Sequence, residues 1–584
     1  MNSVKNSEVK AADVVIIGAG PVGLVAACLL RQQGVEVLVI ERRSSLPTLP
    51  QAHVISTRTM EIFREIGIAQ QVQDIAAPLA KMQAITWCES LTGRRFGALS
   101  FIDVDPAELE AMFAASPTHI NNLAQNKLQP ILLEQAIKLG AQVRFNLSAK
   151  IIKQSNSSVS LMLSDQRGGR ELRANWVIAC DGAASQSRTA LGIQMIGPKS
   201  IRKFLSIYFQ ADLGSCFENG MSGPVHWILG REVRGFLIGF DLKTTWALMV
   251  PFDDPHCPND FNREICTHLV RKAIGSDTTK FTIENVSHWN MSGQVAERFQ
   301  EHRVFLAGDA AHRFPPTGGM GLNTGVQDVH NLAWKIASII KSQAPHSLLL
   351  SYESERKPVA QRNCAHSLNN AENMALVEQA IGASAMAPVS PDAGSEKDAP
   401  RLELGLDGNG AVAVNKRKLV ADAIQAQREH FSFQGLDLGF TYSSLAISHD
   451  GINSGHSTVS RYLAVSDPGA RLPHIWLGLN EKKVSSLDLV GGRFVLLAGA
   501  RADNWFEAGS TFSDWLQVWQ IGRDGLTDPE DQWSRQFSLT LTQALLVRPD
   551  GHIAWRSPQT ASNPLEQLRN VIAMFKKQIL EKAI

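Results

Sequence analysis

An aspartate that follows an apolar run gives this sequence its first candidate binding site. The run Val304–Leu306 predicts a buried strand, and Gly308 and Asp309 come directly after it. A carboxylate at the end of a strand can accept hydrogen bonds from the hydroxyls of a polyol or a sugar. Pro315 and Pro316 fix the backbone that follows and remove two N–H donors. Three glycines follow, so this stretch of backbone carries few side chains: Gly318, Gly319 and Gly321. A flat ring could lie against such a surface.

A glycine-rich turn near the N-terminus could hold a pyrophosphate. The β-branched run at residues 14–17 is followed by G-A-G-P-V-G and then by an apolar pattern typical of a helix. In such a turn the first glycine permits the tight bend, the second admits phosphate, and the third packs helix on strand. The next predicted strand, residues 37–40, ends at an acid that could bind ribose hydroxyls. The candidate residues are Gly18, Gly20, Pro21, Gly23 and Glu41. This motif predicts a dinucleotide but does not choose between NAD and FAD.

A third segment repeats the pattern of a strand followed by an acid. Residues 174–188 give an apolar run, then Asp181 and Gly182, then Ser185 and Arg188. The preceding segment alternates like a small antiparallel meander. Three strand ends, far apart in the sequence, therefore carry small or acidic residues.

Together these segments resemble the three fingerprints of the single-component flavoprotein aromatic hydroxylases, the p-hydroxybenzoate hydroxylase-like monooxygenases. More closely, nearly the whole chain resembles the phenol and polyketide hydroxylases that carry a C-terminal thioredoxin-like domain. The resemblance implies bound FAD, with NADPH or NADH as cosubstrate, and O2 and a small aromatic molecule as substrates. It implies oxygen transfer from a flavin C4a-hydroperoxide to a phenolic or polyketide ring.

The resemblance also assigns roles around the flavin. Asp309 would accept a hydrogen bond from the ribitol, and Pro315 and Pro316 would form a wall beside the ring. A helix that begins near Leu322 and Asn323 would direct its positive end at the flavin. Gln125 occupies the place of a family glutamine that contacts FAD. Residues 51 and 52 read Gln-Ala where many relatives carry Arg-Ala, so the candidate substitutes are Arg42 and Arg58, with a solvated surface charge as the alternative.

Residues 191–289 form short β-rich runs separated by turn residues, and the resemblance makes this sheet the substrate-binding part. The candidate wall residues are Trp227, Phe236, Phe240, Trp246 and Met249. Each could instead be plain core, because alternation buries one face of a sheet in any case. Three residues are candidates to assist substrate deprotonation: His53, Tyr208 and His226. A hydrogen-bonded core residue is the alternative for each.

The predicted fold class is α/β, in three parts. A Rossmann-like FAD-binding domain takes residues 1–78, 118–190 and 290–383, and a β-sheet substrate domain takes 79–117 and 191–289. Residues 384–455, which begin rich in Pro, Gly, Ser and charge, are expected to be a linker and connecting segment. Residues 456–584 are expected to form a thioredoxin-like domain without CxxC, because Cys364 is the last cysteine.

Composition narrows the function classes. Lys and Arg total 57 against 56 Asp and Glu, without a basic block, which argues against nucleic-acid binding. The longest apolar run, residues 14–30, is broken by glycines and a proline, so no membrane span is expected. Seven cysteines without CxxC or metal-ligand spacing predict a reduced cytoplasmic protein without a metal. A homodimer is compatible with this reading.

Other functions stay open at this point. An NAD-dependent dehydrogenase would use only the first motif, and the two later strand ends argue against it. An FAD-binding subunit without catalytic activity, or a flavin-dependent halogenase or epoxidase on the same scaffold, would keep all three motifs.

Overall fold

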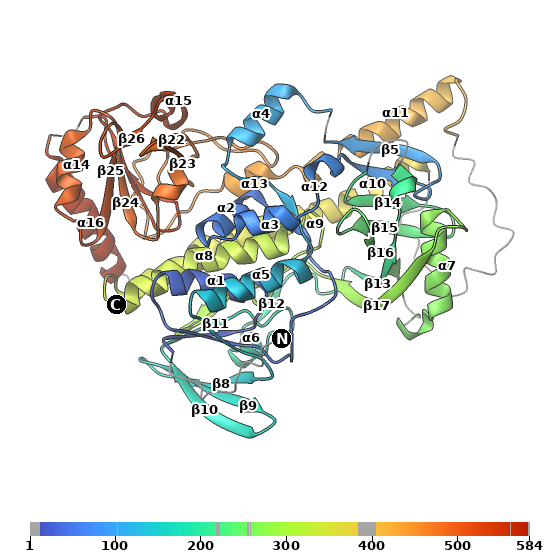
Figure 1. Cartoon of the computed structure of the whole chain (residues 1–584), viewed down its shortest axis with the longest axis horizontal. Coiled ribbons are helices and arrows are strands. Elements are labelled where there is room, and N and C mark those ends of the chain that lie inside the picture. The colour runs from blue at the N-terminus through green and yellow to red at the C-terminus, as the bar shows by residue number, and fades with distance from the viewer. Residues whose placement is uncertain are drawn as a thin grey trace.

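The computed structural model describes residues 12–101, 103–217, 222–253, 256, 258–382, 405–560 and 562–581. Its larger sheets form three bodies (Figure 1): a parallel sheet at the lower centre, an antiparallel sheet in green at the right, and a C-terminal unit in orange and red at the left. No helix in the described ranges combines the length and apolar character needed to cross a bilayer.

The parallel sheet is built from short runs of β-branched residues. Its strand order is β19-β20-β11-β1-β2-β7, and all neighbours except β19 and β20 run parallel. The strands are β1 (Val14–Ile17), β2 (Val37–Ile40), β7 (Gln142–Arg144), β11 (Trp176–Ala179), β19 (Gln300–Glu301) and β20 (Val304–Leu306). The four residues of β1, of β2 and of β11 are all buried, as expected for a parallel sheet covered on both faces.

Helices cover one face of this sheet and a small meander covers the other. The helices are α1 (Pro21–Gln32), α5 (Gln125–Lys138) and α8 (Met320–Ile340), and α1 packs against both of the others. The meander consists of β8 (Ser148–Gln154), β9 (Val159–Asp165) and β10 (Gly168–Ala174). It shares an apolar cluster with the underside of β1 and β2.

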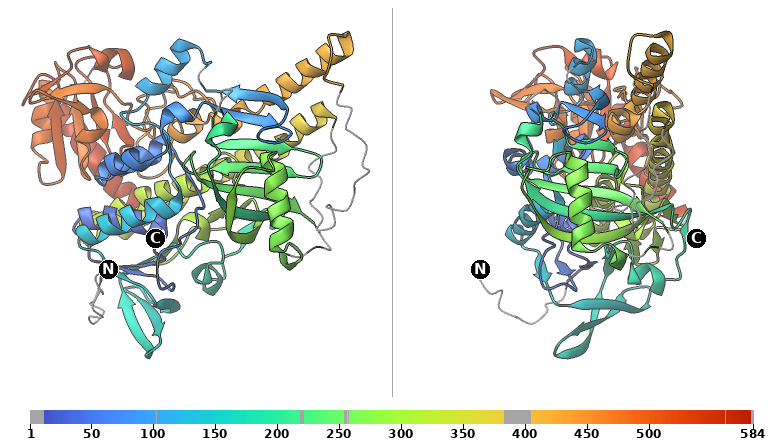
Figure 2. Two further views of the ribbon diagram at one scale, coloured as in Figure 1. Left: turned by 45° about the vertical axis from the view of Figure 1, so that its right-hand side comes forward. Right: turned by 90° about the vertical axis from the view of Figure 1, so that its right-hand side faces the viewer.

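The antiparallel body is a seven-stranded sheet in the order β17-β13-β16-β15-β14-β4-β5. Its strands are β4 (Ala84–Cys88), β5 (Arg95–Ser100), β13 (Arg202–Ala211), β14 (Val225–Leu229), β15 (Arg234–Gly239), β16 (Thr245–Phe252) and β17 (Phe281–Met291). Helix α7 (Arg263–Ile274) lies across one face, as Figure 2 shows, and shares its apolar cluster. The opposite face packs against α10 (Ala375–Ile381) and α11 (Ala411–Gln425).

Shorter elements connect these bodies. They are β3 (Val54–Ile55), α2 (Thr57–Glu65), α3 (Ala69–Ile75), α4 (Pro106–Ala114), β6 (Asn121–Asn122), α6 (Gln186–Ala190), β12 (Met195–Ile196), β18 (Gln294–Ala296), β21 (His312–Arg313) and the long α9 (Leu350–Asn373). Strand β3 pairs antiparallel with β6 and so joins the segment before α2 to the segment before α5.

The C-terminal unit has a four-stranded mixed sheet in the order β25-β24-β27-β28, with apolar clusters on both faces. Its elements are β22 (Trp476–Leu479), β23 (Lys482–Ser485), β24 (Phe494–Ala498), α14 (Asp503–Ser510), β25 (Leu516–Gln520), β26 (Leu526–Thr527), α15 (Gln532–Phe537), β27 (Ala544–Val547), β28 (Ile553–Arg556) and α16 (Pro564–Glu581). Strands β24 and β25 are parallel, and the other pairs are antiparallel.

The segment before this unit differs from the expected linker. Residues 384–404 of that expectation lie outside the described residues, but the rest contains α11, α12 (Arg428–Phe431) and α13 (Gln434–Leu438). Ala413, Val420 and Ile424 are buried, seven and four residues apart, which is the spacing of one helix face. Helix α11 packs because this face meets the antiparallel sheet through Val420 and Ile424.

Candidate active site

Two glycines, one in the turn after β1 and one in the first turn of α1, stand where the backbone leaves no room for a side chain. Gly18 has a φ of +109°, and a Cβ there would lie 2.3 Å from the carbonyl oxygen of Cys180. A Cβ on Gly23 would lie 2.1 Å from the carbonyl oxygen of Gly18. At Gly20, by contrast, a Cβ would meet nothing within 4 Å. Space is therefore open at the N-terminus of α1, where unpaired N–H groups attract phosphate.

Glu41, which directly follows β2, contacts the glycine-rich turn. Glu41 Oε2 accepts a hydrogen bond from the Ala19 N–H at 3.0 Å, and Oε1 accepts one from the Arg43 N–H at 2.9 Å. Pro21 occupies the first position of α1, where its missing N–H costs nothing. Arg42 is exposed and makes no hydrogen bond or ion pair with the described residues. Glu41 thus borders the open space, and Arg42 faces solvent.

The sheet order brings the three sequence motifs together. In β1, β11 and β20 the register pairs Ile17 with Ala179 and Ala179 with Leu306. The turns at residues 18–20, 180–182 and 308–309 therefore leave the carboxyl ends of three adjacent parallel strands. Strand β2 lies on one side of β1 and β11 on the other, and such a reversal of order opens a crevice for ligands.

Asp309 presents a free carboxylate at this edge. Its side chain is exposed, and it accepts no hydrogen bond from the described residues. The segments around this crevice nevertheless displace much of the bulk water near the carboxylate, which raises its pKa, opposed by the charges of His312 and Arg313. A carboxylate held this way can accept hydrogen bonds from ligand hydroxyls.

Asp181 is engaged differently. Its Oδ1 accepts a hydrogen bond from Ser185 Oγ at 2.5 Å, and its Oδ2 accepts one from the Ser187 N–H at 3.0 Å. Arg188, on the helix that follows, donates to the carbonyl oxygen of Ala310 at 2.9 Å. Gly182 has a φ of +79°, and a Cβ there would meet nothing within 4 Å. The Asp181 segment thus braces the turn that carries Asp309, while Gly182 leaves space beside it.

A buried polar cluster holds the Asp309 turn from below. Asp328, on α8, accepts hydrogen bonds from the Gly308 N–H at 3.2 Å and from Arg356 Nε at 2.9 Å, and its Oδ2 lies 2.7 Å from His312 Nε2. Arg356 also donates to Tyr442 Oη at 3.0 Å. Burial raises the pKa of Asp328, but His312 and Arg356 outweigh it and hold the pKa below its usual value. The sequence reading missed this cluster because its members come from separate segments.

The N-terminus of α8 opens toward the same crevice. Gly319 caps the helix with a φ of +63°, and a Cβ there would lie 2.8 Å from Val54 Cβ. Gly321 is different, since a Cβ would meet nothing within 4 Å, and Leu322 is half-buried. Open space therefore lies beside the first turn of a 21-residue helix, whose end carries partial positive charge.

The side chain of Asn323 has a structural task. Its Oδ1 accepts a hydrogen bond from the Ser56 N–H at 2.9 Å, and its Nδ2 donates to the carbonyl oxygen of Val54 at 3.0 Å. In the preceding loop Pro315 is buried, Pro316 is exposed, and the carbonyl oxygen of Pro316 accepts the Gly319 N–H at 3.0 Å. The side chain of Asn323 is therefore not available to a ligand.

Helix α5 contributes two glutamines, of which the sequence reading named one. Gln125 begins the helix, is half-buried, and donates its backbone N–H to the carbonyl oxygen of Ala52 at 2.7 Å. Gln129, one turn later, is buried and donates Nε2 to the carbonyl oxygen of Ala19 in the glycine turn at 3.3 Å. Its Oε1 has no hydrogen-bond partner among the described residues. The sequence did carry a signal for Gln129, because its i, i+4 spacing from Gln125 places both side chains on one face of the helix.

One face of the antiparallel sheet forms an aromatic wall. The wall residues are Phe204, Tyr208, Trp227, Phe236 and Phe240, with the half-buried Met249 beside them. The Trp227 and Phe236 rings lie 5.2 Å apart. Burial raises the pKa of Tyr208, so its phenol stays protonated at neutral pH. The same cluster includes Ala124, next to α5, so this face borders the parallel-sheet body.

Two predicted pocket residues lie on the opposite face. Trp246 packs in the cluster under α7, and its Nε1 donates to the carbonyl oxygen of Ala211 at 3.1 Å. The His226 ring contacts Phe217 and Trp246, and its Nδ1 lies 2.7 Å from Thr86 Oγ1. Burial lowers the pKa of His226 to about 4. Alternation along β14 and β16 separates these two residues from Trp227 and Met249, so His226 and Trp246 fall outside the wall.

His53 lies where the two bodies meet. Pairing of β3 with β6 places its Nδ1 2.5 Å from Asn122 Oδ1, and Asn122 Nδ2 donates to the carbonyl oxygen of Phe240 at 3.0 Å. The His53 ring meets the edge of the Phe240 ring with centroids 5.5 Å apart. Burial lowers the pKa of His53, which favours a neutral imidazole beside the aromatic wall.

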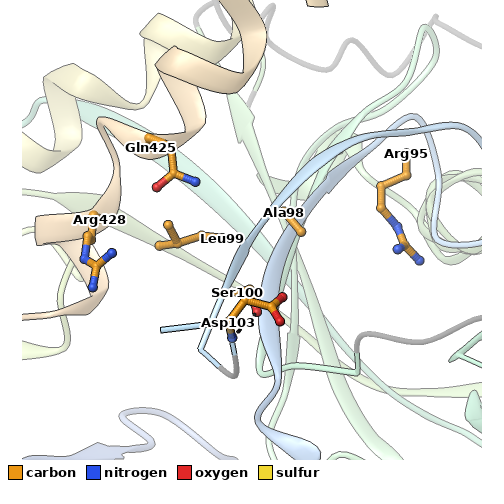
Figure 3. Close-up of a pocket in the computed structure, with 7 residues that line it drawn as sticks. All are labelled: Arg95, Ala98, Leu99, Ser100, Asp103, Gln425 and Arg428. Atoms are coloured by element: carbon orange, nitrogen blue, oxygen red, sulfur yellow. Dashed lines mark hydrogen bonds between the residues drawn. The ribbon is translucent and has the colours of Figure 1, made fainter. Parts of the chain in front are cut away.

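A polar recess of about 390 Å³ opens at the outer border of this wall (Figure 3). Leu99, which lines it, also belongs to the apolar cluster around Trp227. Arg428, at the start of α12, pairs with Glu108 at 2.7 Å. The remaining lining residues are Arg95, Ala98, Ser100, Asp103 and Gln425. The recess is therefore a polar site next to the apolar aromatic wall.

Comparison with known proteins decides the family. Residues 11–367 match a family model described as an FAD binding domain, and residues 466–575 match the aromatic-ring hydroxylase C-terminal domain. The chain belongs to the FAD-binding aromatic-ring hydroxylases. It is 31% identical to 2,4-dichlorophenol 6-monooxygenase of Delftia acidovorans over 95% of this chain and 97% of that protein. It is 32% identical to aklavinone 12-hydroxylase of Streptomyces purpurascens, over 96% and 98%.

Solved structures agree with this family. The flavin-dependent monooxygenase PieE in complex with FAD and substrate has a TM-score of 0.89 at 29% identity, covering 98% of this hydroxylase and all of PieE. A ternary complex of aklavinone-11 hydroxylase with FAD and aklavinone has a TM-score of 0.81 at 30% identity, covering 98% and 100%. The predicted fold class, the FAD cofactor and the aromatic monooxygenase activity are thereby confirmed.

The residues of this hydroxylase suit FAD. The open space at Gly20 and at Gly321 lies beside two helix N-termini, which favour the negative charge of a pyrophosphate and of a reduced flavin. Asp309 and the unpaired Gln129 Oε1 are acceptors for hydroxyl or N–H groups. These hydrogen-bond donors and acceptors together match a ligand that carries phosphates, a polyol and a ring.

Proposed function

We propose that this hydroxylase inserts one oxygen atom of O2 into an apolar phenol, at a carbon ortho or para to the hydroxyl group. The observation that supports this choice is the aromatic wall around Trp227, which borders the body with the three converging turns. Relatives named for 2,4-dichlorophenol and for aklavinone support a phenolic or polyketide ring. Bound FAD would accept hydride from NADH or NADPH and would activate O2.

We assign the FAD contacts to three places in this chain. The backbone at Gly20 and Pro21 would take the pyrophosphate at the N-terminus of α1, with Glu41 beside the ribose. Asp309 would accept hydrogen bonds from the polyol. The first turn of α8, at Gly321 and Leu322, would stabilise negative charge on the ring edge.

The aromatic wall would orient the substrate and exclude water. Burial of Trp227, Phe236 and Phe240 makes this side of the pocket apolar, which protects a reactive oxygen species from solvent. His53, neutral and held by Asn122, would accept the phenol proton at Nε2, because its Nδ1 is already engaged. Loss of that proton would increase electron density at the ortho and para carbons.

The test is hydroxylation itself. The purified hydroxylase is incubated with NADH or NADPH and a panel of phenols that includes 2,4-dichlorophenol, under 18O2. The proposal expects substrate-dependent oxidation of the nicotinamide and one 18O atom in each product molecule. Oxidation of the nicotinamide without oxygen in the product, across the whole panel, would contradict it, and a halogenated product made with added halide would indicate the alternative activity.

Cysteine chemistry supports a cytoplasmic location for this enzyme. Six cysteines lie in the described ranges, at positions 28, 88, 180, 216, 266 and 364, and all are free. Cys257 lies outside the described residues. Free thiols throughout a large protein are typical of a reducing compartment.

A further inference from the structure

Helix α12 lies between the loop at residues 315–319, the proposed flavin-facing loop, and the aromatic wall. The carbonyl oxygen of His430 lies 3.5 Å from the position that a Cβ on Gly318 would take. The next residue, Phe431, packs against the apolar cluster that contains Trp227. Arg428, at the start of the same helix, lines the polar recess of Figure 3. One helical turn thus touches both sides of the crevice.

His430 is buried, and one nitrogen of its ring is unpaired within the described part of the chain. The residue is 5% exposed, its ring stacks on Phe431 with centroids 4.2 Å apart, and Nδ1 has no partner among the described residues. A buried polar atom without a hydrogen-bond partner is destabilising, so its presence calls for an explanation such as a ligand that binds it. Burial, with the nearby charge of His366, lowers the pKa of His430 to about 3 and keeps the ring neutral. A neutral imidazole offers one donor and one acceptor.

A second unpaired polar atom belongs to the wall itself. Trp227 is 6% exposed, and its Nε1–H donor has no partner among the described residues. Trp227 and the Phe431 neighbour of His430 share one apolar cluster. An apolar pocket with a few unsatisfied polar atoms suits a ligand that is a ring with oxygen substituents.

We propose that His430 is a substrate-binding residue whose imidazole hydrogen-bonds the hydroxyl group of the aromatic substrate, beside the loop at Gly318. The inference rests on the proposed function, because it requires a phenolic substrate in this pocket. Val54, which follows His53, lies beside Gly319, and the carbonyl oxygen of His430 lies beside Gly318, so both histidines belong to segments that border the same loop. His430 gives the pocket a preference for a free hydroxyl over its methyl ether.

The test compares two probes on the FAD-loaded hydroxylase. The dissociation constants of 2,4-dichlorophenol and of 2,4-dichloroanisole are measured from the change in flavin absorbance. The wild type is expected to prefer the phenol by about fivefold to tenfold, the value of one buried hydrogen bond. His430→Phe keeps an aromatic ring against Phe431, and it is expected to show a clearly smaller preference for the phenol than the wild type, with the remainder due to His53. His430→Asn, which restores a hydrogen-bonding group near Nδ1, is expected to recover part of the preference.

A matched control separates this role from general effects of losing a histidine. His449 is exposed and forms no interaction among the described residues, so His449→Phe should keep the wild-type preference. A preference unchanged in His430→Phe overturns the inference, and so does a loss of FAD from that variant, which would place His430 on the flavin. Failure of the proposed function is a different result, because then no phenol in the panel supports nicotinamide oxidation.

Discussion

Arg471 in the C-terminal unit forms a buried ion pair with Glu61 on α2, although 410 residues separate them. Arg471 Nε donates to Glu61 Oε2 at 2.9 Å, and Arg58 donates to the same oxygen at 2.7 Å. Burial raises the pKa of Glu61, but the two guanidinium groups outweigh it and lower the pKa to about 2. Because α2 follows the segment that borders Gly319, the C-terminal unit is fixed to the scaffold of the proposed flavin-facing loop.

Removal of the charge at Glu61 should therefore destabilise the whole chain. Glu61→Gln leaves Arg471 and Arg58 buried without a counter-charge, which costs about 3–5 kcal/mol. Arg64→Gln is the control from the same helix, since its partner Asp488 and Arg64 itself are 27% and 39% exposed in their side chains. Loss of such an exposed pair costs less than about 1 kcal/mol. Thermal unfolding measures both, and equal shifts would contradict the interface described here.

Asp309 should decide how much FAD the purified protein carries. Asp309→Ala removes the acceptor proposed for the polyol without removing a hydrogen bond between described residues, so the variant should fold yet purify largely free of flavin. The ratio of absorbance at 450 nm to absorbance at 280 nm reports FAD content, and it should be much lower in Asp309→Ala than in the wild type. Asp277→Ala, an exposed aspartate on the antiparallel body, is the control. A full complement of FAD in Asp309→Ala would remove this residue from the proposed site.

Gly20 and Gly23 should fail in different ways when they are enlarged. Gly20 has a φ of −68° and open space around it, so Gly20→Val should fold but exclude the pyrophosphate. Gly23→Val would drive a side chain into the carbonyl oxygen of Gly18 and should lower the stability of the protein itself. Flavin content and thermal unfolding together separate these outcomes. Normal FAD content in Gly20→Val would mean that the phosphate lies elsewhere.

Much of the proposed FAD-binding site of this enzyme could be predicted from the sequence. Gly18, Gly23 and the apolar runs before Asp181 and Asp309 are local signals, because strand, turn and helix follow one another within each segment. The parallel order β20-β11-β1 then brings their ends together. Local patterns are strong where one segment makes the whole feature.

Features that depend on several segments were out of reach. The residues before His226 do not indicate which face of β14 turns toward the parallel-sheet body. The sequence therefore could not tell which of His226 and Trp227 lies on the wall. Asp328 reads as one polar residue in a helix until Arg356 packs beside it. The helix at residues 411–425 did carry an apolar spacing, which the composition of the preceding residues obscured.

The two faces of the antiparallel sheet give a direct test of the pocket. Trp227→Leu removes a ring from the proposed wall and should raise the KM for the preferred phenol several-fold. Trp246→Leu removes a ring from the cluster under α7, so it should lower stability by about 1–4 kcal/mol but leave the KM near the wild-type value. Steady-state kinetics over the phenol panel measures the difference. Equal effects of the two changes on KM would argue against the assigned face.

Asp437 should make the stability of this chain depend on pH. On α13 it accepts hydrogen bonds from Ser56 Oγ at 2.9 Å, the Arg58 N–H at 2.8 Å and Gln327 Nε2 at 2.9 Å. Burial raises its pKa from 3.8 to about 6 despite these bonds. A raised pKa means that the folded state holds the proton more tightly than the unfolded state. The resulting stabilisation is full below pH 3.8 and is lost as the pH rises through about 6.

The measurement compares the wild type with Asp437→Asn, which cannot ionise, by thermal unfolding at pH 5 and at pH 7.5. The unfolding free energy of the wild type relative to this variant should fall by roughly 1 kcal/mol between the two pH values. Asp488→Asn is the control, because hydrogen bonds from Arg64 outweigh burial and hold the pKa of Asp488 below 3.8. Its contribution is lost only as the pH falls below that value, so its difference from the wild type should be the same at pH 5 and pH 7.5. A difference for Asp437→Asn that is equally constant would show that this carboxyl group is already ionised at pH 5.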